Sequence, residues 1–211
     1  MTTKEQMIET IRSYGVTDER VISAVAAVPR ESFVDWQYRD VAYEDSPLPI
    51  GYDQTISQPY TVAKMIEELE LKEGLKVLEI GAGSGWNAAV MKHIVGKKGR
   101  VVAVEYVAEL VMAARKNLQD AGYEVIVAEA DGSLGYELFA PYDRIIVTCA
   151  APEIPPPYKD QLKEGGIILI PLGRMIQQLI KATKKGSGFK TESLGTYRFV
   201  PLRGKYGFGR D

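Results

Sequence analysis

The sequence predicts an α/β fold in which helices cover both faces of a doubly wound, mostly parallel sheet. The first observation is that short, almost continuously apolar runs alternate with helical segments between residues 74 and 175, as in parallel sheets that are buried on both faces. The second is a loop with alternating glycines, residues 81–85, directly after the first of these runs. With right-handed crossovers, this pattern gives a Rossmann-like sheet.

Length and charge limit the classes of protein that the chain can represent. It has 211 residues, of which 26 are basic and 28 are acidic, for a formal net charge of −2. A typical domain has about 150 residues, so we expect a single domain with an added segment. The near-neutral charge argues against a nucleic-acid partner. No apolar run approaches the roughly 20 residues that span a bilayer, so no membrane partner is expected.

Cysteine and histidine each occur once, as Cys149 and His93. A lone cysteine forms no intramolecular disulfide and suits a reducing compartment, so we expect a cytoplasmic protein. One histidine and one cysteine are too few ligands for a zinc site built from them, and no metal is predicted. We interpret Cys149 as a small buried side chain and His93 as a partly exposed or capping residue.

The N-terminal third of the chain is expected to be mainly helical. Residues 3–28 have the apolar spacing of two short helices, and Asp18 suits the N-cap of the second. Residues 41–57 contain two prolines and a glycine and are expected to be irregular. The first turn of a helix tolerates Pro59, and the apolar stripe after it predicts a third helix that ends near residue 71.

From residue 74 onward the apolar period alternates between that of strands and that of helices. Five strands are expected, at residues 76–80, 100–105, 124–128, 144–148 and 166–171. Helices are expected between them, from the glycine loop to residue 94, across residues 110–118 and at residues 156–162. Two further strand-like runs, 177–183 and 192–200, are joined by the polar segment KKGSG, which predicts a hairpin-like C-terminal end.

Three carboxylates follow the first three predicted strands of the sheet at equal intervals. Glu79, Glu105 and Asp131 are 26 residues apart, about the length of one strand and its helix. They should therefore meet at the carboxyl edge of the sheet, where ligands bind in this fold class. Carboxylates only accept hydrogen bonds, so the row suits a ligand rich in hydroxyl and amino donors, such as a nucleoside. The alternative is that they are solvated acids at strand ends.

The glycine loop distinguishes between nucleosides. Its glycines let a ligand approach the backbone, but Trp86 occupies the position of the last glycine in the dinucleotide fingerprint. Glu79 would repel a phosphate group and attract an ammonium group. A ligand with an amino-acid end, a ribose and an adenine meets these demands, and the sequence therefore predicts S-adenosylmethionine as the cofactor.

Each acid then has a predicted partner on this ligand. Glu79 would face the ammonium group, and Glu105 would accept hydrogen bonds from the two ribose hydroxyls. Asp131 would bind the adenine amino group, beside the flexible Gly132. The loop residues expected to contact the cofactor are Gly81, Gly83, Ser84 and Gly85.

Five segments extend the pattern beyond the cofactor loop. They are LPIGYDQTISQPYTVA at 48–63, LEIGAGSGWNAAV at 78–90, APYDRIIVTCAAPEIP at 140–155, QLKEGGIILIPLG at 161–173 and FVPL at 199–202. Together they resemble the motifs of the protein-L-isoaspartate (D-aspartate) O-methyltransferase family, in the same order. The resemblance implies methyl transfer from S-adenosylmethionine to the free α-carboxylate of L-isoaspartyl residues in damaged proteins, and the family's name extends this to D-aspartyl residues. The ester would then close to a succinimide, which reopens partly to aspartate.

The resemblance also implies which residues surround the reaction. The family places the serine of its TIS motif at the reacting carboxylate, and this serine is Ser57 here. The neighbours expected to bind the substrate are Thr55, Ile56, Gln58 and Tyr60. The family commonly has a glycine where Asp53 stands. A carboxylate is already a nucleophile at neutral pH and the sulfonium is already activated, so proximity and exclusion of water can replace a general base.

The position of Ser57 allows two interpretations. It precedes the helix that Pro59 begins, so its hydroxyl and the free N–H groups of the helix start could bind an anion together. Alternatively, Ser57 only caps the helix.

We interpret the chain as one methyltransferase domain, residues 1–211. Residues 1–73 would form a helical cap and a substrate-side segment, residues 74–175 the cofactor-binding core and residues 176–211 the C-terminal strands. We expect a monomer whose partners are damaged proteins. Two alternatives remain: a methyltransferase that acts on RNA or a small molecule and does not need the region around Ser57, and a protein that senses S-adenosylmethionine without catalysis.

Overall fold

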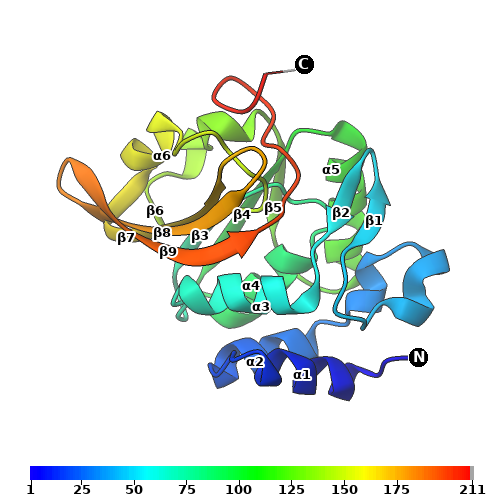
Figure 1. Cartoon of the computed structure of the whole chain (residues 1–211). Coiled ribbons are helices and arrows are strands. Elements are labelled where there is room, and N and C mark those ends of the chain that lie inside the picture. The colour runs from blue at the N-terminus through cyan, green and yellow to red at the C-terminus, as the bar shows by residue number, and fades with distance from the viewer. Residues whose placement is uncertain (210–211) are drawn as a thin grey trace.

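A seven-stranded sheet in the order β5-β4-β3-β6-β7-β8-β9 organises the computed structural model, which describes residues 1–209 (Figure 1). The parallel strands are β3 (Lys76–Ile80), β4 (Arg100–Glu105), β5 (Ile126–Glu129), β6 (Tyr142–Val147) and β7 (Leu162–Leu172). The antiparallel strands are β8 (Gln177–Lys185) and β9 (Gly188–Tyr197). The predicted mostly parallel sheet with a hairpin-like end is confirmed.

Helices cover both faces of this sheet. Alternate residues of the strands enter two separate apolar cores, because side chains along a strand point to opposite faces. Val77 belongs to one core and Leu78 to the other. The first core also holds side chains of α4 (Trp86–Val95) and α5 (Ala108–Asp120), and the second holds Tyr158 of α6 (Pro156–Gln161).

The N-terminal helices pack on the face that α4 and α5 cover. They are α1 (Lys4–Ser13), α2 (Glu19–Ala27) and α3 (Pro59–Glu68). Figure 1 shows α1 and α2 beneath α3 and α4, on the side of the sheet away from α6. Asp18 caps α2 by accepting a hydrogen bond of 2.9 Å from the Arg20 N–H, as expected. None of the helices within residues 1–209 is both long and apolar enough to span a bilayer.

The segment expected to be irregular contains a small hairpin. Strands β1 (Leu48–Gly51) and β2 (Gln54–Ile56) pair antiparallel. Tyr52 and Asp53 connect them with φ angles of 54° and 58°, which is the positive-φ pair of a type I′ turn. The prediction missed this hairpin because neither turn residue is glycine and the strands are short. Asp53 adopts the backbone conformation that a glycine favours, so the turn forms without one.

Other boundaries differ by a few residues. Helix α3 ends at Glu68, earlier than expected, and β9 begins at Gly188, so only Gly186 and Ser187 lie between β8 and β9. Four short 3₁₀ helices were not expected from the sequence. They are η1 (Arg30–Phe33), η2 (Trp36–Val41), η3 (Gly132–Leu134) and η4 (Glu137–Phe139). Single helical turns have too few residues for a periodic apolar pattern.

Candidate active site

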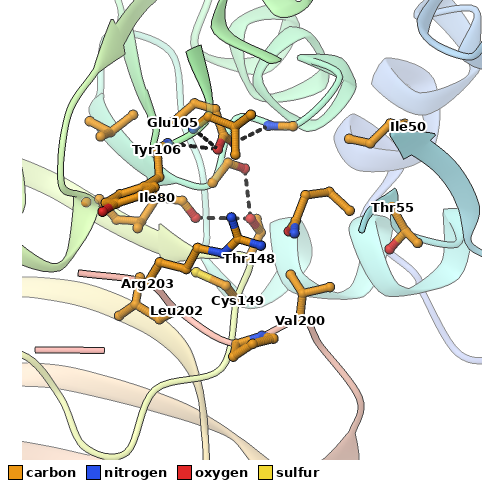
Figure 2. A pocket seen from close by; sticks show the side chains of 17 residues that line it. Ile50, Thr55, Ile80, Glu105, Tyr106, Thr148, Cys149, Val200, Leu202 and Arg203 are labelled. Atoms are coloured by element: carbon orange, nitrogen blue, oxygen red, sulfur yellow. Dashed lines mark hydrogen bonds between the residues drawn. The ribbon is translucent and has the colours of Figure 1, made fainter. Parts of the chain in front are cut away.

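A pocket opens at the carboxyl ends of β3, β4 and β6, where the strand order reverses. This strand-end pocket has a volume of about 600 Å³, counting the solvent-open space at its mouth. Figure 2 shows three parts of the chain around it: Ile80 and Glu105 at the strand ends, Ile50 of the β1–β2 hairpin, and Val200 and Leu202 of the C-terminal segment. The edge predicted from the row of acids therefore carries a pocket.

A second chamber and a groove adjoin the strand-end pocket. The inner chamber has a volume of about 450 Å³, counting its solvent-open space, and is lined by Glu79. It shares Thr55, Thr148 and two glycines of the loop with the strand-end pocket. The surface groove, on the outside of the molecule, is also lined by Thr55 and Thr148. Ser57 lines both the inner chamber and the surface groove. All three cavities therefore meet beside Thr55 and Thr148, within reach of Ser57.

Glu79 is a fully buried carboxyl group with an unsatisfied oxygen. Its Oε1 accepts a hydrogen bond of 2.6 Å from Nδ2 of Asn87, on α4. Within residues 1–209, Glu79 Oε2 and Asn87 Oδ1 are buried without a hydrogen-bond partner. Burial raises the pKa of Glu79 to about 8 from an ordinary 4.5, because desolvation favours the neutral form. When Glu79 is ionised, its Oε2 and Asn87 Oδ1 are both buried acceptors without donors, which fits a ligand that brings N–H groups, and an ammonium group in particular.

The carboxylate of Glu105 ties the glycine loop to the end of β4. Its Oε1 accepts hydrogen bonds from the N–H groups of Tyr106 (2.8 Å) and Val107 (3.0 Å). Its Oε2 accepts one of 3.0 Å from the N–H of Gly83 in the loop. The side chain lines the strand-end pocket (Figure 2). Each carboxylate oxygen has two lone pairs, so Oε2 of Glu105 keeps one of them for a hydroxyl group in the pocket.

Asp131 lies beside the strand-end pocket and lines a neighbouring hollow. Its Oδ1 accepts hydrogen bonds from the N–H (2.9 Å) and hydroxyl (2.6 Å) of Ser133, and its Oδ2 accepts one of 2.9 Å from the N–H of Lys205. A Cβ on Gly204 would lie 1.9 Å from Asp131 Oδ1. The C-terminal segment is therefore packed directly on this acid. Gly132, the next residue, does line the strand-end pocket.

The glycine loop has the backbone that its residue types suggest. Gly81, Gly83 and Gly85 all have positive φ angles, of 94°, 52° and 89°, which glycine adopts at little cost. The Ser84 carbonyl accepts a hydrogen bond of 3.0 Å from Asn117 Nδ2 on α5. The loop is thus fixed between β3 and α5 and lies against both the strand-end pocket and the inner chamber.

Substituting Gly81 with alanine is expected to destabilise the protein and to disturb the pocket. Its φ of 94° is strained for alanine, and the new Cβ would lie 2.4 Å from Thr148 Oγ1. We expect a loss of about 1–3 kcal/mol in the free energy of unfolding from backbone strain, with a further loss from the clash. Urea unfolding measures it. Gly74→Ala is the matched control, because Gly74 has a φ of 86° with nothing within 4 Å of the added Cβ. Equal losses of unfolding free energy in the two variants would show that the contact with Thr148 adds nothing to the backbone strain.

Ser57 does not cap α3. The N-cap is Gln58, whose side chain makes no capping hydrogen bond. Instead, Asp45 Oδ1 accepts a hydrogen bond of 2.8 Å from the Tyr60 N–H in the first turn. The structure therefore contradicts the interpretation of Ser57 as a helix cap. One of the helix-start N–H groups that were expected to bind an anion, that of Tyr60, already donates to the Asp45 carboxylate.

The four residues expected to bind substrate surround Ser57 with different exposures. Thr55 is exposed and lines all three cavities. Gln58 and Tyr60 are half-buried and line the surface groove. Ile56 is buried in the core that α3 covers and borders only the inner chamber among the cavities described above. The structure therefore brings the four together, with three of them on the groove.

Sequence reasoning missed two polar side chains of the site. The Thr148 hydroxyl lies within hydrogen-bond distance of two carbonyls that share its one hydrogen, those of Ile80 (3.0 Å) and Gly81 (2.8 Å); Figure 2 shows Thr148 beside Ile80. Because Thr148 directly follows β6, the strand-end argument used for the acids could have found it. Asn87 faces Glu79 from the second position of α4, and no pattern in the sequence signalled it.

The lone cysteine and the lone histidine have the expected surroundings. Cys149 is buried against the strand-end pocket, and its burial raises the pKa of the thiol, so it stays neutral. His93 is exposed on α4, with Nδ1 3.2 Å from the Tyr123 hydroxyl. Within residues 1–209 there is no group of three or more His, Cys, Asp or Glu side chains that could hold a metal ion.

Comparisons with known proteins show to which family the chain is similar. The family model for protein-L-isoaspartate(D-aspartate) O-methyltransferase (PCMT) matches residues 2–207. Protein-L-isoaspartate O-methyltransferase 1 of Archaeoglobus fulgidus is 52% identical over 203 residues, covering 96% of this chain and 94% of that protein. The protein-L-isoaspartate O-methyltransferase of Methanothrix thermoacetophila is 50% identical over 206 residues, covering 97% of both chains.

Solved structures show the same relationship. One protein-L-isoaspartate O-methyltransferase superposes with a TM-score of 0.90 at 36% identity, covering 97% of this chain and 67% of that chain. A putative protein-L-isoaspartate O-methyltransferase from Plasmodium falciparum, in complex with S-adenosyl-L-homocysteine, superposes with a TM-score of 0.84 at 25% identity, covering 96% of this chain and 99% of that chain. The matches span almost the whole chain, including the segments around Glu79 and Ser57, and we conclude that it belongs to the protein-L-isoaspartate(D-aspartate) O-methyltransferase family.

Proposed function

We propose that this chain transfers the methyl group of S-adenosylmethionine to the free α-carboxylate of L-isoaspartyl residues in damaged proteins, with Ser57 binding the acceptor. One observation carries the assignment of Ser57. It lines both the inner chamber, in which Glu79 presents an unpartnered oxygen, and the surface groove, which is open to a polypeptide. A donor bound against Glu79 and an acceptor in the groove would therefore meet beside Ser57.

The strand-end pocket and the inner chamber fit the methyl donor. The unpartnered oxygens of Glu79 and Asn87 suit its ammonium group, and Glu105 suits the ribose hydroxyls. We assign the adenine to the region of Gly132, where Oδ2 of Asp131 keeps one free lone pair beside the carboxylate's three hydrogen bonds. The glycine loop, Gly81 to Gly85, would contact the amino-acid end.

The acceptor side needs orientation more than acid–base chemistry. Thr55, Gln58 and Tyr60 line the groove around Ser57 and would hold the polypeptide on either side of the damaged residue. S-adenosylmethionine supplies a methyl group that its sulfonium already activates, and a carboxylate is already a nucleophile at neutral pH. The chain therefore has to align the two groups and exclude water, which accounts for a site built from hydroxyl and amide side chains.

Ser57→Ala is expected to slow methyl transfer and leave cofactor binding nearly unchanged. A hydrogen bond to a charged group contributes about 1.5–3 kcal/mol, so kcat/KM for an isoaspartyl peptide should fall roughly 10- to 100-fold. Transfer of radiolabelled methyl groups measures the rate, and calorimetry with S-adenosylhomocysteine measures the binding. Ser187→Ala, on the exposed turn between β8 and β9, is the matched control.

The same assay tests the substrate. Label should enter an isoaspartyl peptide and not the peptide of the same sequence with normal aspartate; equal labelling of both would refute the proposed substrate. A Ser57→Ala variant with wild-type kcat/KM would refute the role of Ser57.

We further propose that the chain acts as a monomer in the cytoplasm without nucleic acid, in keeping with its lone cysteine and net charge of −2. Analytical ultracentrifugation tests the monomer. We keep the division into residues 1–73, 74–175 and 176–211 as a working description of one domain.

A further inference from the structure

We infer that Arg30 is a positioning residue for methyl transfer: its buried guanidinium fixes the Ser57 backbone relative to the helix that starts at the glycine loop. The inference rests on the proposed role of Ser57. Arg30 lies in η1, far in the sequence from both Ser57 and the loop, and lines none of the three cavities described above. It would act through the backbone and not by touching a ligand.

The guanidinium is fully buried; Nη1 and Nη2 donate to backbone carbonyls, and Nε is buried without a hydrogen-bond partner within residues 1–209. Its Nη1 donates to the Ala42 carbonyl at 2.5 Å. Its Nη2 donates to the carbonyls of Ser46 (3.0 Å) and Ser57 (3.1 Å). The side chain is 0% exposed. Burial lowers the pKa of Arg30 to about 10, so the group is still a cation at neutral pH.

A cation in this position is costly, because burial removes its hydration. An apolar side chain would fill the same space without that cost. What the guanidinium adds is a rigid fork of donors that joins three loop segments, at Ala42, Ser46 and Ser57. None of these carbonyls is in a strand or an α-helix, so the fork supplies the order that secondary structure does not.

The other side of the guanidinium contacts the helix of the cofactor loop. The Arg30 Cζ lies 5.4 Å from the centre of the Trp86 ring, within the range of a cation–π contact. Trp86 is the first residue of α4 and directly follows Gly85. Its Nε1 donates a hydrogen bond of 3.1 Å to the Val28 carbonyl, two residues before Arg30. One buried side chain thus touches both the acceptor segment and the helix of the donor loop.

Asp45 completes the attachment from the opposite side. Its Oδ1 accepts from the Tyr60 N–H (2.8 Å) and its Oδ2 from Gln58 Nε2 (3.1 Å). Its charge also favours the cationic form of Arg30. The segment from Ser57 to Tyr60 is therefore held at both ends. The Arg30 cation binds the Ser57 carbonyl, and the Asp45 carboxylate binds the Tyr60 N–H. Both contacts use groups other than the Ser57 hydroxyl, which the proposed function assigns to the substrate.

The expected effect is on the rate of the chemical step. Displacing one reacting group by about 1 Å can slow an aligned reaction roughly 100-fold. Lysine keeps the charge of Arg30 but has a single nitrogen, which lacks the planar fork that reaches three carbonyls. Arg30→Lys should therefore lower kcat at least roughly tenfold, while the dissociation constant of S-adenosylhomocysteine stays within about twofold of wild type.

A rescue experiment separates positioning from general damage to the fold. Arg30→Ala leaves a cavity of guanidinium shape, and guanidinium chloride at a concentration well below unfolding should restore part of its kcat; urea at the same concentration should not. The matched control is Arg20, an exposed arginine that donates to the Leu71 carbonyl at 3.0 Å. Arg20→Lys and Arg20→Ala should keep the wild-type kcat and show no rescue.

Amide hydrogen exchange supplies a readout that needs no substrate. Arg30→Lys should exchange faster than wild type in peptides covering residues 42–60 and equally in peptides covering residues 100–118. Wild-type exchange at residues 42–60, or a wild-type kcat in a folded Arg30→Lys variant, would each overturn the inference. A wild-type chain that labels no isoaspartyl peptide would instead refute the proposed function, and the exchange data would still decide whether Arg30 holds the Ser57 segment.

Discussion

Glu79→Gln is expected to stabilise the ligand-free protein at pH 8 and, at the same time, to weaken its binding of S-adenosylmethionine. The wild-type carboxyl is fully buried with Oε2 unpartnered, and its pKa is raised to about 8. Glutamine has nearly the same shape and can accept the hydrogen bond from Asn87, but it carries no charge at any pH. It therefore removes the cost of a buried anion and also removes the partner of the ligand's ammonium group.

The pH dependence follows from the two pKa values. Below pH 4.5 Glu79 is protonated in both the folded and the unfolded chain and adds nothing to the dependence. Between pH 4.5 and about 8 the unfolded chain loses this proton while the folded chain keeps it, so the folded state is progressively destabilised as the pH rises. The upper bound of this loss is about 5 kcal/mol, reached above pH 8. The advantage of Glu79→Gln should grow over the same interval.

Urea unfolding of both proteins without ligand, at pH 5.5 and pH 8.5, measures this difference. Glu129→Gln is a suitable control, because Glu129 also ends a strand but is exposed. Wild type should release protons when S-adenosylmethionine binds near pH 7, since the ammonium group favours the carboxylate. Calorimetry in buffers of different ionisation enthalpy detects the release. Equal pH slopes for wild type and Glu79→Gln would show that Glu79 is not the buried acid described here.

Glu105→Ala is expected to weaken cofactor binding roughly 10- to 100-fold, which corresponds to about 1.5–3 kcal/mol for hydrogen bonds to a charged group. Two losses combine. The ribose hydroxyls lose their acceptor, and the Gly83 N–H loses the bond that holds the glycine loop to β4. The Tyr106 and Val107 N–H groups lose their acceptor as well.

Calorimetry with S-adenosylhomocysteine measures the loss of cofactor binding in Glu105→Ala. Urea unfolding of the same variant shows how much of this loss comes from a less stable fold. Glu109→Ala is the matched control, since it removes the same charge from an exposed position in the first turn of α5. An unchanged dissociation constant in Glu105→Ala would show that the ribose assignment is wrong.

The sheet and the place of the pocket could be predicted because they depend on local patterns. Strands β3 and β4 have the predicted bounds, since runs such as KVLEI and RVVAVE are apolar on both faces and are ended by glycine or a polar residue. The equal spacing of the acids placed Glu79 and Glu105 at one edge for the same reason. The Tyr52–Asp53 turn was missed because its positive φ angles arise without the residues that usually mark them.

What could not be predicted depends on contacts between distant parts of the sequence. The spacing of Asp131 places it at a strand end, but the Lys205 N–H that it binds is 74 residues away. The contact of Asp45 with the first turn of α3 was missed for the same reason. Ser57 was considered as the cap because it is adjacent in the sequence, whereas Asp45, which binds the Tyr60 N–H, is 15 residues away. Arg30 showed no signal either: a single arginine after Pro29 looks like any surface residue until its three carbonyl partners are known.

The C-terminal segment that closes the strand-end pocket has a consequence for the newly made protein. Leu202 and Arg203 line the pocket, and the Lys205 N–H binds Asp131; in Figure 1 this red segment runs back from β9 to the strand ends. Ribosomes synthesise these residues after every other part of the pocket. A nascent chain that has not yet reached these residues lacks one wall of its binding site. Acquisition of the methyl donor is therefore a late event in biogenesis, after nearly all of this sequence has been translated.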